Sequence, residues 1–205
     1  MARYTGAKCR LCRREGQKLF LKGERCFLNC PIDKKGAAPP GVHGRRGFRR
    51  MSSYGEQLRE KQKVKRSYGI GERQLRGYFE EAKKTRGATA ELLLRSLEIR
   101  LDNVLYRLGF ALSRSVARQL VNHGHVSVNG KRVDIPSYRV KVGDTISFNS
   151  KSFGIIIVKK SMEADSLSTK WLERKGGVGK MVRMPTREDI DIGINENLVV
   201  EYYSR

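Results

Sequence analysis

The stretch LDNVLYRLGFALSRSVARQLVNHGHVSVNGKRV, from Leu101 to Val133, decides the fold. Apolar residues recur in its first part, between Leu101 and Leu108, with the 3.6-residue period of a helix. Ser113 can then cap a second helix, in which apolar residues again share one face. Gly124 can take the left-handed conformation that ends such a helix. The stretch therefore predicts two short amphipathic helices in succession.

A hairpin signal follows these helices. Val126 and Val128 alternate with polar residues, and Asn129-Gly130 is a preferred two-residue hairpin turn. Basic residues outnumber acidic ones on the positions left for the surface, a pattern typical of phosphate binding. The candidate RNA contacts in and beside this stretch are Arg100, Arg107, Arg114, Arg118, His123, Lys131 and Arg132.

The overall charge indicates a polyanionic partner. The chain has 205 residues and a formal net charge of +22, and its positive charge is concentrated before residue 87. An anionic membrane surface is the competing partner, but no basic helix shows the broad aromatic face that would anchor it there. With no apolar run of ~18 residues and no signal-peptide pattern, we expect a cytoplasmic protein.

Two segments that overlap this stretch and extend to Asp144 carry a resemblance to a known family. RLDNVLYRLG and SRSVARQLVNHGHVSVNGKRVDIPSYRVKVGD resemble the RNA-binding module of bacterial small-subunit ribosomal protein S4. The resemblance to that ribosomal protein family extends from MARYTGAKCRLCRREG at the start to NENLVVEYYSR at the end. It implies a protein of the cytoplasmic small ribosomal subunit.

The resemblance also implies a specific role and partners. A member of this family would bind the five-prime domain of 16S rRNA directly, nucleate assembly of the subunit body and contact ribosomal protein S5. With S5 it would contribute to translational accuracy. Its own messenger RNA is a further candidate partner, and the sequence leaves this open.

All four cysteines lie near the start, as Cys9-x2-Cys12 and Cys26-x3-Cys30. Two close pairs joined by a linker can supply four thiolates to a structural zinc ion, and nearby basic residues favour the thiolate form. An iron–sulfur cluster and free thiols remain alternatives. Disulfides fit poorly in a chain without a secretory signal. Some bacterial members of the family carry such a quartet and others lack it, so the resemblance is compatible with a zinc-bearing form.

The next segment, residues 31–50, is rich in proline, glycine and arginine. It has too little apolar surface to offset the entropy of ordering, so we expect disorder in the free chain and an extended path along RNA when bound. A solvated linker is the alternative. The candidate RNA contacts are Arg45, Arg46, Arg49 and Arg50.

Helical patterns occupy residues 52–100. Ser53 and Glu56 have the spacing of a capping box for a basic helix that ends near Tyr68. A second helix follows from Glu72 to Lys84, and a third begins at Thr89. The candidate RNA contacts on the basic helix are Lys61, Lys63, Lys65 and Arg66.

The remaining chain predicts short elements. We expect strands at Thr145–Phe148 and at the apolar end, Leu198–Tyr203. Propensity favours a strand at Phe153–Val158, whereas the resemblance implies a helix there. The glycine-rich run Lys175–Lys180 lacks the spacing of a nucleotide-binding loop.

The predicted fold class is α+β. A basic N-terminal zinc-binding arm and a helical domain precede an RNA-binding module of two helices packed on a short antiparallel sheet. The expected divisions are 1–50 for the cysteine-bearing arm, 51–94 for the helical region, 95–160 for the module, and 161–205 for a segment that packs back on the body.

No set of acids, bases or nucleophiles converges in the sequence, so we do not expect an enzyme. The alternative to a ribosomal protein is a free-standing zinc-bearing regulator that binds RNA or DNA. No helix shows the base-reading pattern of a DNA-binding dimer, which favours the ribosomal interpretation.

Overall fold

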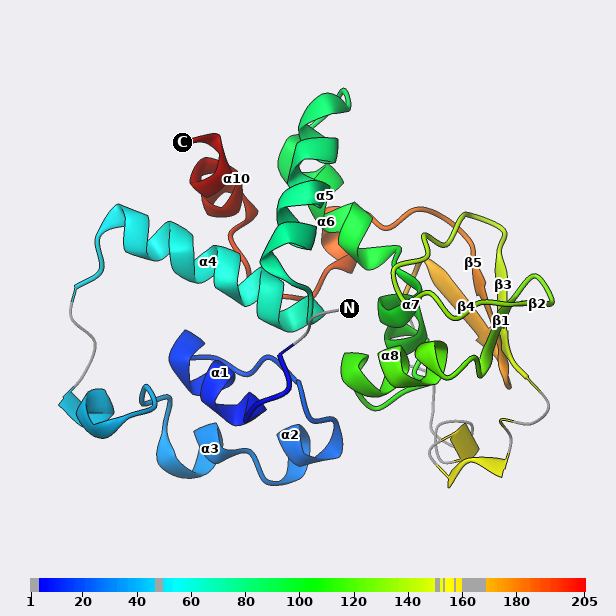
Figure 1. Cartoon of the computed structure of the whole chain (residues 1–205), viewed down its shortest axis with the longest axis horizontal. Helices are drawn as coiled ribbons and strands as arrows, with labels where there is room; N and C mark the ends of the chain where they lie inside the picture. Colours follow the sequence, from blue (N-terminus) through cyan, green and yellow to red (C-terminus); the bar gives the residue numbers. More distant parts are fainter. Residues whose placement is uncertain (1–3, 47–49, 150–151, 153, 157, 160–168) are drawn as a thin grey trace. The chain divides into compact units, whose positions relative to one another are not determined.

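The computed structural model describes residues 4–46, 50–149, 152, 154–156, 158–159 and 169–205. The chain forms two units. The first unit comprises Met1–Leu93 and Ile192–Arg205, and the second comprises Leu94–Asp191. Figure 1 shows the helices of the first unit and the mixed helix and sheet structure of the second.

The N-terminal arm of the first unit contains short helices and little apolar core. Among its described residues, the buried apolar side chains are those of Leu19 and three of the cysteines. Two short helices lie inside the stretch that the sequence analysis expected to be disordered. The elements of the arm are α1 (Lys8–Glu15), α2 (Glu24–Leu28), α3 (Pro31–Lys35) and the 3-10 helix η1 (Val42–Arg46).

Longer helices complete the first unit. They are α4 (Ser53–Tyr68), α5 (Glu72–Lys84) and the C-terminal α10 (Glu196–Ser204), while α6 (Thr89–Glu98) leads from this unit into the second. The N-cap of α4 is Ser52, whose side chain accepts a hydrogen bond from the Gly55 amide, so the predicted cap at Ser53 was wrong by one residue.

The C-terminal segment is a helix, so the predicted strand at Leu198–Tyr203 was wrong. Asn195 caps it, and Val199 is buried. Tyr203 stacks on Phe79 of α5 with ring centroids 5.0 Å apart, and Gln57 of α4 donates a hydrogen bond to Glu201. Packing against α4 and α5 thus overrides the strand propensity of this apolar run.

In the second unit α7 (Leu101–Arg107) and α8 (Arg114–Asn122) pack with an antiparallel sheet, as predicted. Ser113 caps α8 by accepting a hydrogen bond from the Val116 amide. Within the described residues the sheet has five strands in the order β2-β1-β3-β5-β4. The strands are β1 (Val126–Val128), β2 (Lys131–Arg132), β3 (Thr145–Phe148), β4 (Leu172–Lys175) and β5 (Val178–Met181).

The hairpin turn forms at Asn129-Gly130, where both residues have positive φ. In the register of the sheet, Val128 faces Lys131 on β2 and Ile146 on β3. Apolar residues of α7, α8 and the strands form one core, which also includes Trp171. The glycine-rich run near Lys175 is the β4–β5 hairpin, which the sequence analysis did not identify.

The segment with conflicting predictions is helical in part of its described residues. Ile156, Val158 and Lys159 are in helical conformation, and the Lys159 amide donates to the Ile155 carbonyl. The strand favoured by propensity is therefore wrong for these residues. In the part of the chain that the structure describes, no helix is long and apolar enough to span a membrane.

Candidate nucleic-acid interface

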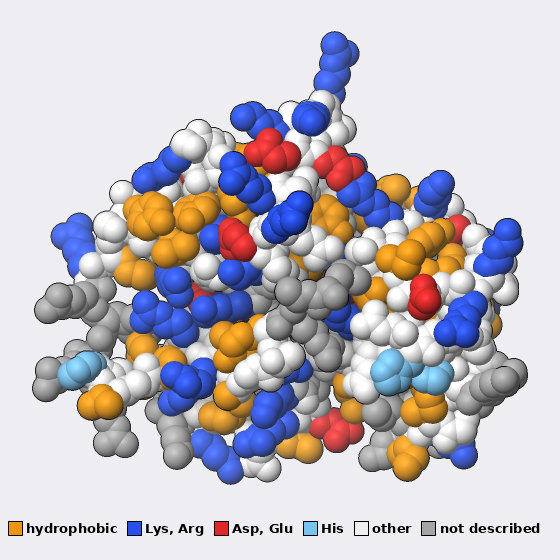
Figure 2. Space-filling view, viewed as in Figure 1, with side chains coloured by type: hydrophobic (Ala, Val, Ile, Leu, Met, Phe, Trp, Pro, Cys, Tyr) orange, Lys and Arg blue, Asp and Glu red, His pale blue; other side chains and the backbone are white. Residues whose placement is uncertain are grey.

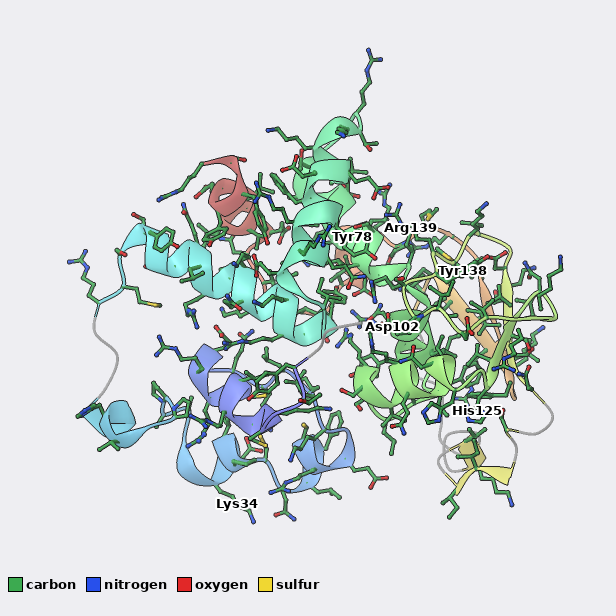
Figure 3. The ribbon with its side chains drawn as sticks, in the orientation of Figure 1. Lys34, Tyr78, Asp102, His125, Tyr138 and Arg139 are labelled. Carbon is green, nitrogen blue, oxygen red and sulfur yellow. The ribbon has the colours of Figure 1, made fainter. Side chains whose placement is uncertain are left out.

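Arg100 and Arg118 lie inside the second unit and hold the carboxylate of Asp102. Arg100 has no exposed surface, and its Nη2 lies 2.8 Å from Asp102 Oδ2. Nη1 of Arg118, which is also buried, lies 3.2 Å from the same oxygen. Figure 3 labels Asp102 at the position of these contacts. Arg118 thus joins α8 to Asp102 of α7, and Arg100 pairs with the same carboxylate at the start of α7. The sequence placed both arginines on an RNA face, but both are buried in the structure.

A second internal network surrounds Glu98. Arg107 donates two hydrogen bonds to its carboxylate, at 2.8 and 3.0 Å, and Asn103 donates another at 2.7 Å. Arg114 Nε donates to Asn103 Oδ1, and the Arg114 guanidinium lies over the Tyr106 ring, 4.5 Å from its centroid. Arg107 and Arg114 are partly exposed, unlike Arg100 and Arg118. Both are nevertheless oriented by protein groups.

The basic side chains predicted on α4 also make internal ion pairs. Lys61 is buried and lies 2.7 Å from Glu72, which also pairs with Lys65 at 3.0 Å. Lys63 pairs with Glu60, and Arg66 pairs with the buried carboxylate of Glu15. A run of lysine and arginine on a helix is thus used here largely to bind neighbouring elements of the first unit.

These pairs perturb the carboxylates in opposite directions. Burial opposes ionisation of Glu72, but hydrogen bonds from Lys61 and Lys65 outweigh it and lower the pKa of Glu72 to about 2. Burial raises the pKa of Glu15, against the attraction of Arg66 and Arg59. The difference arises because the Glu72 side chain is partly exposed, whereas that of Glu15 is fully buried.

The hairpin of the second unit presents its predicted cations to solvent. Lys131 and Arg132 on β2 are exposed, as is His123 at the end of α8. The Arg132 guanidinium covers Gly124, where an added Cβ would lie only 2.2 Å from its nitrogens. Absence of a side chain at Gly124 thus lets Arg132 lie against the helix end. His125, labelled in Figure 3, contacts Ser152 instead.

Several exposed cations were missed by the sequence analysis. On α5 the polar face opposite the buried Leu75, Tyr78, Phe79 and Ala82 carries exposed basic residues, and this face could have been found from the same helical period. In Figure 2 blue side chains gather over the region of α1 to α4. The missed residues of the first unit are Arg10, Arg14, Lys22, Arg25, Lys34, Arg73, Arg76, Lys83, Lys84, Arg86 and Arg205.

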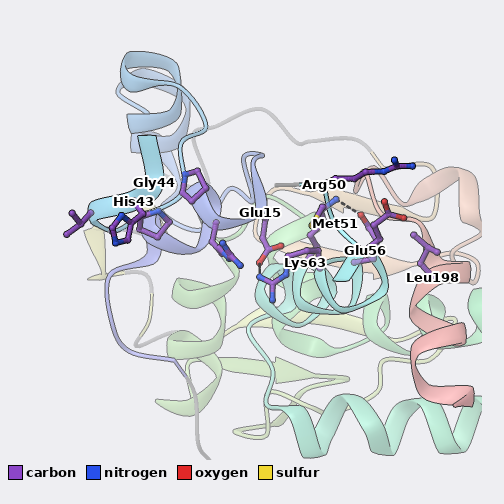
Figure 4. A pocket seen from close by; sticks show the side chains of 15 residues that line it. Glu15, His43, Gly44, Arg50, Met51, Glu56, Lys63 and Leu198 are labelled. Atoms are coloured by element: carbon purple, nitrogen blue, oxygen red, sulfur yellow. Dashed lines mark hydrogen bonds and ion pairs between the residues drawn. The ribbon is translucent and has the colours of Figure 1, made fainter. Parts of the chain in front are cut away.

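A cavity of about 650 Å³ lies between η1 and α4 of the first unit. Figure 4 shows His43 and Gly44 on one side and Lys63, Glu56 and Leu198 on the other. Arg50 lines it and is exposed. Of the other predicted arginines of the arm, Arg45 and Arg46 lie in η1 with side chains outside the described part, and Arg49 lies outside the described residues.

The four cysteines lie around one small pocket. Cys9, Cys12, Cys26 and Cys30 all line it, and all four thiols are free. The Lys22 amide donates to Cys26 Sγ over 3.3 Å, a contact that suits a thiolate. Soft sulfur donors in one enclosed site suit zinc in chemical terms. Across the residues that the structure describes, however, no three His, Cys, Asp or Glu are grouped as a metal site.

The acidity of Cys12 differs from expectation. The basic neighbourhood was expected to favour the thiolate, yet burial raises the pKa of the Cys12 thiol, and the other three cysteines raise it further. Four thiols this close repel one another as thiolates. A cation among them would remove this repulsion.

Comparisons with known proteins agree with the fold. Residues 3–98 match the Ribosomal protein S4/S9 N-terminal domain, and residues 99–146 match the S4 domain. The chain is 58% identical to small ribosomal subunit protein uS4 of Acetivibrio thermocellus and 53% identical to that of Thermus thermophilus, with 100% of each chain covered. It is 54% identical, over the same full extent, to uS4 of Dictyoglomus turgidum. The chain therefore belongs to the ribosomal protein uS4 family.

Proposed function

We propose that this chain is a constituent of the small ribosomal subunit and binds ribosomal RNA directly. The observation that carries the proposal is the match over the full length to relatives named small ribosomal subunit protein uS4, at 53% to 58% identity. The S4 domain matched at residues 99–146 and the net charge of +22 support it. The function needs no catalytic group.

Binding would rest on phosphate contacts and shape. The hairpin residues Lys131 and Arg132 and the exposed cations of the first unit offer positive charge at the surface. Structured RNA hides most base edges from side chains, so sequence readout would contribute little. Buried Arg100 and Arg118 would act indirectly, by holding α7 and α8 in place beneath that surface.

A finer assignment follows from the family resemblance. The RNA target would be the five-prime domain of 16S rRNA, where binding would nucleate assembly of the subunit body. Ribosomal protein S5 would be a neighbour in the subunit, and the pair would contribute to translational accuracy. The cytoplasmic small subunit is the corresponding location.

Salt dependence of binding tests the proposal. A transcript of the 16S rRNA five-prime domain should bind with a slope of log K against log salt of about −5 or steeper, because each phosphate contact releases counterions. Lys131→Ala with Arg132→Ala should reduce the magnitude of that slope by about 1 to 2. Asp134→Ala, an exposed acidic neighbour, is the matched control and should not reduce it.

The competing function is a free-standing zinc-bearing regulator of RNA or DNA. Fractionation of a cell extract separates the two functions, because a ribosomal constituent co-sediments with small-subunit particles. A chain found mainly outside those particles, or a shallow salt slope with the rRNA transcript, would contradict the proposal.

For the cysteines, we propose one structural zinc ion held by Cys9, Cys12, Cys26 and Cys30. The four sulfur donors around one pocket, three of them buried, support this. Bound zinc would fix α1, α2 and α3 to one another, with no open position for a substrate. Metal analysis of the purified chain should find about one equivalent of zinc. Iron in its place would indicate a cluster. If the purified chain contained neither zinc nor iron, the proposed metal site would be wrong.

A further inference from the structure

The N-terminal arm presents an aromatic pair to solvent. The rings of Phe20 and Phe27 lie 5.2 Å apart between centroids with an interplanar angle of 31°. Phe27 is 67% exposed, and its neighbour Leu28 is 79% exposed. Burial would normally be expected for such side chains, because exposing them to water is unfavourable.

The backbone supports this arrangement at a local cost. Phe20 has φ of +49°, a conformation that is uncommon for a bulky residue other than glycine or asparagine. The residue before it, Leu19, is buried in the arm, so the chain turns Leu19 inward and Phe20 outward. Strain that holds a side chain at the surface is more common at binding positions than elsewhere.

Charge around the pair indicates the class of partner. Lys22 lies two residues after Phe20, and Arg25 lies in α2 with Phe27. Both are exposed, and Glu24 is the acidic residue between them. Lys34, on α3 of the same arm, is also exposed and points outward (Figure 3). Exposed aromatic rings among cations are the combination that binds unpaired nucleotides, with bases on the rings and phosphates on the basic side chains.

We propose that Phe20 and Phe27 form a stacking platform for an unpaired base of the RNA. The platform deepens the proposed function and rests on it. Phe27 contacts the base face to face, and Phe20 supports the opposite side of the Phe27 ring. Stacking on a ring face is tolerant of base identity, so the platform selects single-stranded or bulged nucleotides rather than a sequence.

Substitutions at Phe27 separate stacking from general apolar contact. In the full chain, loaded with one equivalent of zinc, Phe27→Leu keeps an apolar side chain but removes the ring. It should weaken binding of the 16S rRNA five-prime-domain transcript about tenfold, while the salt slope stays unchanged because no charge is lost. Phe27→Trp should bind at least as tightly as the unaltered chain.

The tryptophan variant also reports the contact directly. Trp171 is fully buried in the second unit, so emission from an exposed tryptophan at residue 27 can be separated from it at long wavelength. Stacking should quench this emission when the transcript is added. Val42→Ala, at an aliphatic residue of the same arm that is 94% exposed, is the matched control and should change neither affinity nor slope.

Other results would overturn the platform. If Phe27→Leu bound the transcript as tightly as the unaltered chain, and the emission of Phe27→Trp were not quenched, the rings would not contact RNA. If Phe27→Ala bound the transcript with unchanged affinity but was no longer incorporated into small-subunit particles, the rings would contact a protein partner and not RNA. Failure of the unaltered chain to bind the transcript would overturn the proposed function itself.

Discussion

The cysteine-bearing arm, residues 4–46, and the module in the second unit are both rich in arginine and lysine, yet their interiors differ. The module encloses a continuous apolar core, and two of its arginines are buried against Asp102. Buried apolar side chains in the arm are few, and three of them are cysteines. Its basic residues Arg10, Arg14 and Arg25 are exposed.

The difference shows that positive charge serves two purposes in one chain. Where a core exists, arginine can be held by buried carboxylates and used to fix helices to one another. Where the core is small, cations remain on the surface and stability must come from another source. For the arm we propose that this source is a metal ion.

The largest effect is expected from removing the metal ligands. Cys9→Ser with Cys12→Ser should unfold the arm, because binding of a structural zinc ion contributes on the order of 10 kcal/mol to folding of so small a segment. Hydrogen exchange of the arm's amides should become fast, and zinc content should fall. Amides of α7 and α8 serve as the internal control and should keep their protection. An arm that stays protected without metal would show that it folds on its own apolar contacts.

A smaller but still large effect is expected in the module. Asp102→Ala should lower the free energy of unfolding by about 3–5 kcal/mol, because it leaves Arg100 and Arg118 buried without their carboxylate. Urea denaturation followed by Trp171 fluorescence measures the change. Asp134→Ala, at an exposed position of the same unit, should change stability by less than ~0.5 kcal/mol. If Asp102→Ala were as stable as Asp134→Ala, the pairs of Arg100 and Arg118 with Asp102 would not stabilise the unit.

The smallest effect concerns Glu72 on the surface of the first unit. The pKa of Glu72 is lowered from its ordinary value of 4.5 to about 2. The contribution of its charge to the free energy of unfolding is therefore present at neutral pH and is lost as the pH falls from 4.5 toward 2. Because 44% of the side chain is exposed, solvent screening reduces this contribution to about 1 kcal/mol. Comparing Glu72→Gln with the unaltered chain across this pH range measures it.

Glu80→Gln, at an exposed position of the same helix, is the control for that comparison. The stability difference between Glu72→Gln and the unaltered chain should shrink as the medium becomes acidic. A difference that is constant with pH would mean that the Lys61 and Lys65 pairs contribute nothing through the charge of Glu72.

Local signals in the sequence predicted much of the module. Ser113 caps α8, Asn129-Gly130 forms the hairpin turn, and Thr145–Phe148 is a strand, as expected. Each of these features depends on a few adjacent residues, so each can be read without knowing the fold. The C-terminal helix depends on packing partners distant in sequence and was missed. The β4–β5 hairpin was also missed, although its Gly176-Gly177 turn is a local hairpin signal.

The sequence by itself determined the family, the mixed helix and sheet fold and the polyanionic class of the binding partner. These follow from motifs and net charge, which are properties of residue order and composition. Tertiary structure alone decided which cations remain available for that partner. Arg100 and Lys61 look like surface charges in the sequence, but Asp102 and Glu72 hold them within the fold. The physical reason is that an ion pair is set by which carboxylate lies within a few ångströms, and periodicity cannot reveal that distance.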